Sequence, residues 1–351
     1  MGRTGKLLAL FATSALLLVA SCAVPVPSSD AGEAALASPV WPKPPERARI
    51  RYVRSVNGPQ DWGIQRSFLR RLADAFTGGG EELFVRPGAV AERDGVLYVA
   101  DAGAQALWIL DTPRARYIRL TQAGDATLVS PVALAVRADG SVFVADTALK
   151  KIFLFDRTGV TIRTFAAQAL ERPAALAWDE AVQRLYVLDS VKHRISVFDA
   201  TGTLMRHIGE GGSGDAQFNH PTHIALDAAG MLIVTDALNF RIQVLDRDGR
   251  LVRKFGQAGD GTGDFAAPKG VAVDSAGNVH VVDALFDAVQ IFNPQGRLLL
   301  AYGERGTQRG QFSLPGGIFI TPADRIYVAD SYNRRVQIFQ GAIANEAGEE
   351  K

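Results

Sequence analysis

The apolar positions of this chain form short runs that recur in six copies. In each copy a proline opens one run, a second run ends in an aspartate, and a third run ends near a glycine. A period of 43 to 47 residues separates the aspartates, which are Asp101, Asp146, Asp189, Asp236, Asp283 and Asp330. A period of that length indicates stacked supersecondary units.

The fifth copy shows what one unit contains. Residues 268–296 read PKGVAVDSAGNVHVVDALFDAVQIFNPQG, and the further run LLLAYG follows. The runs have the length of strands, and turn residues such as Ala-Gly-Asn separate them. They are apolar at nearly every position, as expected for sheets covered on both faces. Four short antiparallel strands make a propeller blade, so the sequence predicts an all-β, six-bladed β-propeller.

Two copies carry a more specific motif. Residues 232–245 read LIVTDALNFRIQVL, and residues 326–339 read IYVADSYNRRVQIF. They resemble the NHL-repeat family of six-bladed β-propellers, whose blades carry Y-V-x-D followed by N-x-R-I/V-Q-x-F. The resemblance extends over residues 87–340 and departs from the pattern at Ala106 and Ala288, where the other copies have Lys or Arg. It implies a closed ring and, in some members, RNA binding on a positively charged face.

The sixth copy lacks a fourth strand, because residues 335–340 lead into a polar tail, residues 341–351. Residues 49–56 (RIRYVRSV), upstream of the first copy, form an unassigned run of strand length. We expect this run to pair into the last blade and remove an exposed sheet edge. The propeller would then span residues 46–340.

The N-terminus has the pattern of an export signal. Two basic residues precede an apolar run from Leu7 to Ala20, which is short for a membrane span and typical of a signal peptide, residues 1–21. The run leads into Val-Ala-Ser-Cys22, which resembles the lipobox of bacterial lipoproteins and implies acylation of Cys22. By the same resemblance, Ala23 favours sorting to the outer membrane, with the protein facing the periplasm. The alternative is an ordinary export signal with an incidental cysteine.

Composition adds a tether and argues against nucleic acid as a partner. Residues 22–45 are rich in Pro, Ser and Ala and predict a disordered linker behind the lipidated cysteine. The chain has a net charge of +1, so it has no basic field for phosphate binding. Its single cysteine leaves no disulfide in the exported domain. We expect a monomer.

One insertion, residues 59–82, interrupts the repeat. Its centre, RSFLRRLADAF (residues 66–76), places Phe68, Leu69, Leu72 and Phe76 on one helical stripe. This helix is expected to cap one face of the ring or the mouth of its channel. The alternative is a docking helix with exposed arginines.

A propeller enzyme would place its chemistry at the central channel. The residues expected at the starts of the innermost strands are Ala89, Ala133, Ala175, His223, Gly270 and Gly317. A catalytic zinc site needs three protein ligands, which small apolar residues cannot supply. Similarly, the Glu, Asn and Asp set of calcium-dependent lactonase-like propellers is absent from these positions. The expected cofactor is none; the alternative is Zn or Ca held by His220 and His223, with Asp287 or Asn239 completing the site.

The repeated aspartates and glycines are interpreted as structural. Each aspartate precedes a turn, where a carboxylate can accept backbone N–H groups, and four are followed five residues later by Lys or Arg. The Gly-rich connections 209–218, 256–265 and 303–312 lack the spacing of a phosphate-binding loop. Each ends in Phe, which we expect to be a buried anchor.

Residues that differ between blades are better candidates for binding. Positions three and four after the aspartates lie at hairpin tips, where repeat proteins present a binding surface. The candidate face, with its channel and neighbouring residues, comprises Lys150, Lys192, His193, His223, Asn239, Phe240, Phe286, Asp287, Tyr332 and Arg334. The mixture of aromatic and cationic groups is typical of protein interfaces.

The sequence therefore favours a noncatalytic binding scaffold for a protein, peptide or envelope polymer. The alternative is a metal-dependent hydrolase or lyase with its site at the channel.

Overall fold

The computed structural model describes residues 38–65, 82–165 and 170–341. The predicted signal peptide, Cys22, the predicted helix of residues 66–76 and the polar tail from residue 342 lie outside the described residues.

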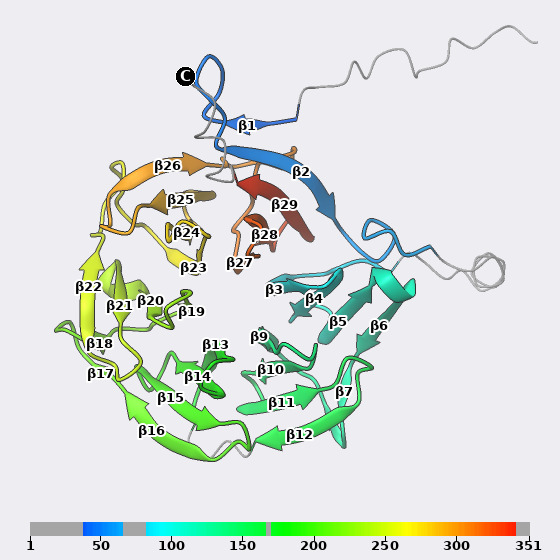
Figure 1. The fold of residues 1–351 in the computed structure, drawn as a ribbon. Helices are drawn as coiled ribbons and strands as arrows, with labels where there is room; N and C mark the ends of the chain where they lie inside the picture. Colours follow the sequence, from blue (N-terminus) through cyan, green and yellow to red (C-terminus); the bar gives the residue numbers. More distant parts are fainter. Residues whose placement is uncertain (1–37, 66–81, 166–169, 342–351) are drawn as a thin grey trace, which may run out of the picture. The chain divides into compact units, whose positions relative to one another are not determined.

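Six sheets surround a central axis, as predicted, and Figure 1 looks along this axis. Each of the first five blades has four antiparallel strands, and the proline-opened strand is innermost. Blade one contains β3 (Pro87–Arg93), β4 (Val96–Asp101), β5 (Ala106–Asp111) and β6 (Arg116–Leu120). Blade two contains β9 (Pro131–Val136), β10 (Val142–Asp146), β11 (Lys151–Phe155) and β12 (Thr161–Phe165). Blade three contains β13 (Pro173–Asp179), β14 (Arg184–Asp189), β15 (Arg194–Asp199) and β16 (Leu204–Ile208). Blades four and five contain β19 (His223–Leu226), β20 (Leu232–Asp236), β21 (Arg241–Leu245) and β22 (Leu251–Phe255); β23 (Pro268–Val273), β24 (Val279–Asp283), β25 (Ala288–Phe292) and β26 (Leu298–Tyr302).

The remaining elements are short. They are the two-stranded pairs β7 (Gln122–Ala123) with β8 (Ala126–Thr127) and β17 (Glu210–Gly211) with β18 (Gln217–Phe218), and the 3-10 turns η2 (Thr112–Arg114) and η3 (Ala237–Asn239).

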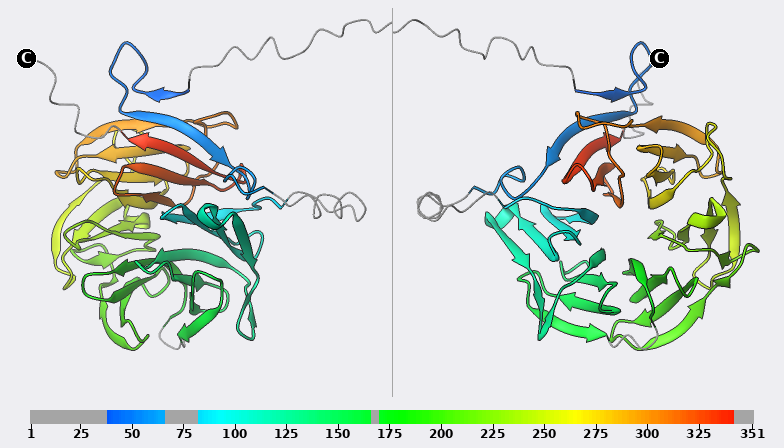
Figure 2. Two further views of the ribbon diagram at one scale, coloured as in Figure 1. Left: turned by 45° about the vertical axis from the view of Figure 1, so that its right-hand side comes forward. Right: turned by 180° about the vertical axis from the view of Figure 1, so that it is seen from behind.

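Blade six closes the ring with both ends of the propeller. It contains β27 (Ile318–Ile320), β28 (Arg325–Asp330) and β29 (Arg335–Gly341), and β2 (Ile50–Val56) pairs antiparallel with the outer edge of β29. Figure 2 shows β2 (blue) lying along β29 (red). The predicted closing strand is confirmed.

The structure differs from the predicted linker at its C-terminal end. Residues 40–41, expected to be disordered, form β1 (Val40–Trp41), which pairs with the outer edge of β2. The Trp41 ring lies 5.8 Å from Tyr302 and 5.9 Å from Phe339, measured between centroids. This aromatic packing orders a segment that the Pro-rich composition predicts to be extended and free.

The core is divided among six apolar clusters, each of which lies between two neighbouring blades. The cluster between blades six and one also takes up Trp62 and Ile64 from the start of the inserted segment, and both are buried. Every blade thus depends on two neighbours for burial of its faces. This explains why its strands are apolar on both sides.

One end of the ring is used below as the upper face. Strand register places each aspartate opposite or near the proline that opens its blade, as with Asp101 and Pro87 or Asp283 and Pro268. The hairpins that follow the aspartates therefore lie at the same end as the starts of the innermost strands. The upper face is defined by these hairpins and by the loops that lead into the prolines.

Candidate binding face and central channel

The carboxylates of the six aspartates lie beneath the upper face and accept hydrogen bonds from its loops and hairpins. All are fully buried. Asp101 accepts hydrogen bonds from the backbone N–H groups of Val85 (2.7 Å) and Arg86 (2.8 Å) in the preceding loop and of Ala104 (2.9 Å) in its own hairpin. Asp146, Asp189 and Asp283 bind their loops and hairpins in the same way. The predicted structural role is confirmed, since these carboxylates satisfy backbone donors that burial would otherwise leave unpaired.

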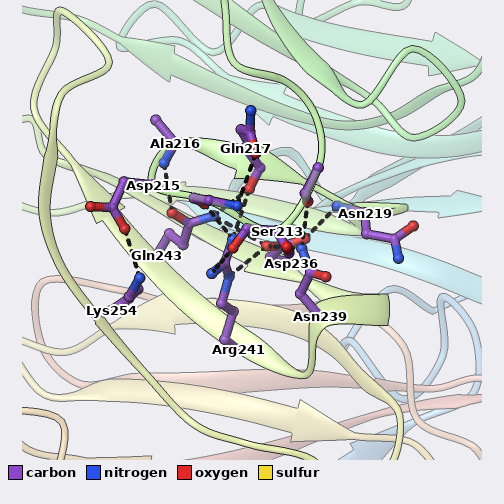
Figure 3. Close-up of polar contacts among 12 residues, drawn as sticks. Ser213, Asp215, Ala216, Gln217, Asn219, Asp236, Asn239, Arg241, Gln243 and Lys254 are labelled. Carbon is purple, nitrogen blue, oxygen red and sulfur yellow. Dashed lines mark hydrogen bonds and ion pairs between the residues drawn. The ribbon is translucent and has the colours of Figure 1, made fainter.

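Blade four extends this arrangement into a clamp (Figure 3). The Arg241 Nε lies 2.8 Å from the Asp236 carboxylate, and the Asn239 and Gln243 amides also donate to this carboxylate. The other Arg241 nitrogens donate to the carbonyls of Ser213, Gly214 and Gln217 in the Gly-rich connection. The N-x-R-I-Q motif therefore holds the loop between blades.

Blade six repeats the clamp with Asp330, Asn333, Arg335 and Gln337 on the 303–312 loop. The predicted pairing between aspartate and the cation five residues later is seen in these two blades. The phenylalanines that end the three Gly-rich connections, Phe218, Phe265 and Phe312, are fully buried as expected. These loops are structural connectors between blades.

The central channel contains a cavity of about 240 Å³. Its wall comes from the innermost strands of all six blades and includes Ala89, Ala133, His223 and Gly317 of the predicted positions. Among the described residues that line it, Arg93 and His223 are the only ionisable ones, and none is a carboxylate. A calcium site needs several oxygen ligands and a catalytic zinc three protein ligands, so this wall does not fit either metal.

His223 is a neutral imidazole at physiological pH. Its position in the channel wall removes hydration from the ring, and this desolvation lowers the pKa to about 4. His220, its proposed partner in the alternative metal site, instead packs against His193 of the neighbouring blade, with ring centroids 4.7 Å apart. The His220 backbone N–H also donates to the Nδ1 of His193 at 2.9 Å. The described residues contain no cluster of three metal-binding side chains.

The hairpin tips have the same backbone in every blade. The fourth residue after each aspartate has a left-handed φ between 51° and 58°; these residues are Gln105, Lys150, His193, Phe240, Asp287 and Arg334. Their different side chains are therefore presented by one shared turn geometry. No sequence signal other than the repeat itself predicts this conformation, because L residues such as Phe rarely adopt it.

The candidate binding residues divide by exposure. Lys150, Lys192, Tyr332 and Arg334 are exposed, and Lys150 forms an ion pair with Glu171 at 2.7 Å. Phe240, which packs on the core cluster between blades four and five, and Phe286 are half-buried.

Two of the candidates serve the fold. Asn239 donates to Asp236 and to the Gly212 carbonyl. Asp287, expected at an exposed tip, is 2% exposed; it accepts from the Arg305 side chain and from the Leu314 N–H, each at 2.7 Å. The Asn239 amide nitrogen and both Asp287 oxygens are therefore engaged within the fold.

Of the second residues after the aspartates, only Tyr332 was predicted from the sequence as a binding residue. This position holds Val191, Leu238, Leu285 and Tyr332 in blades three to six, and all four side chains are exposed. The signal was present in the aligned copies, as large apolar residues where a solvated turn would have polar ones.

Comparison with models of protein families shows to which family the chain belongs. The family model described as "SMP-30/Gluconolactonase/LRE-like region" matches residues 71–258, more than half of the chain. The chain belongs to the SMP-30/gluconolactonase/LRE-like family. A model of the NHL repeat also matches this SMP-30/gluconolactonase-type propeller, at residues 312–339, in agreement with the resemblance seen in blade six.

Solved structures agree on the fold. A streptogramin B lyase is 15% identical, with a TM-score of 0.57 over 74% of this chain and 94% of that chain. A virginiamycin B lyase from Staphylococcus aureus is 12% identical, with a TM-score of 0.56 over 73% and 95% of the two chains. Hydrazine synthase from Kuenenia stuttgartiensis is 16% identical, with a TM-score of 0.54 over 74% and 78%. At these identities the similarity shows only that this family member shares their propeller fold.

No curated protein matches the chain. Within residues 38–65, 82–165 and 170–341, the propeller has no helix with the length and apolar character of a membrane span.

Proposed function

We propose that this propeller is a noncatalytic binding protein of the cell envelope whose upper face takes up a protein, peptide or envelope polymer. It would be exported and anchored to the outer membrane by lipid on Cys22, facing the periplasm as a monomer. The observation that carries this proposal is the contrast between the channel and the upper face. The described channel wall has no carboxylate and one imidazole, whereas the upper face presents exposed side chains that differ from blade to blade.

Capture from a periplasmic extract on the immobilised full chain tests the binding role. The triple variant Lys192→Ala, Phe286→Ala and Arg334→Ala should lose the captured partner, because it removes cationic and aromatic groups from one face. A matched variant carries Met205→Ala, Arg250→Ala and Arg297→Ala on the outer strands and turns, and it should retain capture. Equal loss in both variants would contradict a binding role of the upper face.

The alternative function is a metal-dependent hydrolase or lyase, and one observation favours it. His223 offers a neutral imidazole to the channel, in a fold shared with streptogramin lyases. The metal content of the purified chain, measured by plasma mass spectrometry after dialysis without chelator, distinguishes the two. Near one equivalent of zinc or calcium that is lost in His223→Ala would overturn the binding role and direct a screen of lactones, esters and amides.

A further inference from the structure

One exposed apolar side chain from every blade lies on the upper face. These residues, named here the apolar ring, are Val85, Val129, Val191, Leu238, Leu285 and Tyr332, and they are between 40% and 63% exposed. Blades three to six supply theirs from the second position after the aspartate. Blades one and two have Gly103 and Ala148 at that position and supply a valine from the loop that leads into the proline.

Blade one shows how the loop valine substitutes for the missing tip. A Cβ added to Gly103 would lie 2.8 Å from the Cγ1 of Val85, so Val85 occupies the space of the absent side chain. The N–H groups of Val85 and Val129 each donate to the buried aspartate of their blade at 2.7 Å. Both valines are therefore held on the upper face by the contact that holds the hairpins.

The other exposed apolar residues that the structure describes do not form a comparable group on one face. Most of them belong to outermost strands, as do Ile162, Met205, Val252 and Leu299, and they are scattered around the outer wall. In the described part of the opposite end, the exposed apolar side chains Val160 and Val182 lie singly in two turns, not one from every blade. A set of apolar side chains gathered on one face marks an interaction site.

The charge next to the apolar ring has one dominant sign. Exposed cations at the tips and beside the opening prolines are Arg86, Lys150, Arg172, Lys192, Lys269 and Arg334. Glu171 lies among them and is already ion-paired to Lys150. Farther out, Glu210, Asp264 and Glu304 are hydrogen-bonded within their own Gly-rich loops, Asp215 is ion-paired to Lys254, and the loops also carry the exposed carboxylates Asp125 and Asp260.

We propose that the apolar ring docks an acidic polypeptide segment that carries aliphatic or aromatic side chains. This inference rests on the proposed binding function and specifies the partner's chemistry. Apolar side chains of the segment would contact the apolar ring, and its carboxylates would meet the surrounding cations, an electrostatic complementarity that also fixes register. A peptide fits better than a bilayer, because valines project little beyond the backbone and the cations around the apolar ring can pair with carboxylates spaced along a peptide.

Fluorescence anisotropy on the full chain tests the inference with a labelled peptide of alternating aspartate and leucine. Two comparison peptides replace aspartate by lysine or leucine by serine. We expect the aspartate–leucine peptide to bind most tightly, with an affinity that falls as salt is added. The triple variant Val191→Ser, Leu238→Ser and Leu285→Ser should weaken it by about tenfold or more.

The matched control carries Ile162→Ser, Met205→Ser and Leu299→Ser on outer strands and should bind as the parent does, with both triples keeping the parent's thermal midpoint. Equal binding of all three peptides, or equal weakening by both triples, overturns the inference. Binding of phosphatidylglycerol vesicles that depends on the ring, without peptide binding, would replace the peptide by a membrane surface. The capture experiment separates this inference from the proposed function. If partner capture is lost in the Lys192, Phe286 and Arg334 variant but kept in the Val191, Leu238 and Leu285 variant, the proposed function stands and the docking role of the apolar ring is refuted.

Discussion

At the scale of single residues, one carboxylate repeated in six copies organises the upper face. An aspartate at the end of a buried strand can reach the N–H groups of its own hairpin and of the loop 15 to 18 residues earlier, as Asp101 and Asp189 do. Its burial is compensated by hydrogen bonds to the charged form. In blades four and six an arginine extends the same carboxylate into a network that covers the connection between blades.

Loss of the arginine in such a clamp should destabilise the protein strongly. Arg241→Met leaves the Asp236 carboxylate buried without its ion-pair partner and frees three loop carbonyls, so we expect a loss of about 3 kcal/mol in the free energy of unfolding. Urea denaturation measures it. The control Arg250→Met alters an arginine whose side chain is 79% exposed and should change stability by less than about 0.5 kcal/mol. Similar losses in both variants would contradict the clamp.

The lowered pKa of His223 predicts a pH dependence of stability. An unfolded histidine has a pKa near 6.5 and the folded ring one of about 4, so below about pH 6.5 the unfolded state binds more protons than the folded state. This destabilises the fold progressively as the pH falls toward 4. The free energy of unfolding of His223→Gln should therefore fall less between pH 7 and pH 4.5 than that of the parent. Parallel pH profiles of the two proteins would show that His223 is not desolvated.

At the scale of elements, the unit of about 45 residues is not a blade that folds by itself. Each apolar cluster lies between two blades, and β2 supplies the outer strand of the blade that ends at Gly341. Trp41 on β1 packs over this junction, against Phe339. The ring is therefore closed by strand pairing and by side chains from both ends of the propeller.

Deletion of residues 46–56 should lower the thermal midpoint sharply. It removes the hydrogen bonds between β2 and β29 and exposes the apolar edge that Ile50 and Tyr52 cover in the cluster between blades five and six. Differential scanning calorimetry on the deletion variant measures the effect. Trp41→Ala, which removes only the outer aromatic contact, should lower the midpoint less. An unchanged midpoint in the deletion variant would contradict closure by β2.

At the scale of the whole molecule, the ring separates a structural interior from a variable upper face. The channel is lined mainly by small and aliphatic residues, whereas charged and apolar side chains gather at the tips. Because every tip has the same turn, side chains can differ among blades without disturbing the ring. This division suits a binding protein.

The proposed location is tested by Cys22→Ser. If lipid on this residue anchors the chain, the parent should incorporate labelled palmitate and sediment with outer membranes, whereas the variant should be soluble in the periplasm, because several acyl chains are needed for a stable hold. An unchanged membrane fraction for the variant would contradict lipid anchoring. The control variant Ser21→Ala changes the neighbouring residue but keeps the Cys22 thiol, and it should remain lipidated.

The sequence alone determined the blade count, the closing strand and the structural role of the aspartates. Each of these depends on periodic burial and on hydrogen bonds over short separations, which recur in every copy and so can be read from the repeat. The same regularity placed the hairpin tips on one face. It also predicted which residues begin the innermost strands, and four of them, Ala89, Ala133, His223 and Gly317, line the described channel cavity.

Only the tertiary structure decided which tip residues reach solvent. In the sequence, Asp287 and Asn239 occupy positions equivalent to exposed ones. In the structure, Asp287 accepts a hydrogen bond from Arg305, and Asn239 donates one to the Gly212 carbonyl of the Gly-rich loop. The ordering of Trp41 likewise depends on aromatic partners more than 250 residues away. The apolar ring combines tip and loop residues from different blades, because Val85 fills the space above Gly103. Such substitutions arise from packing in three dimensions, which a repeat in one dimension does not record.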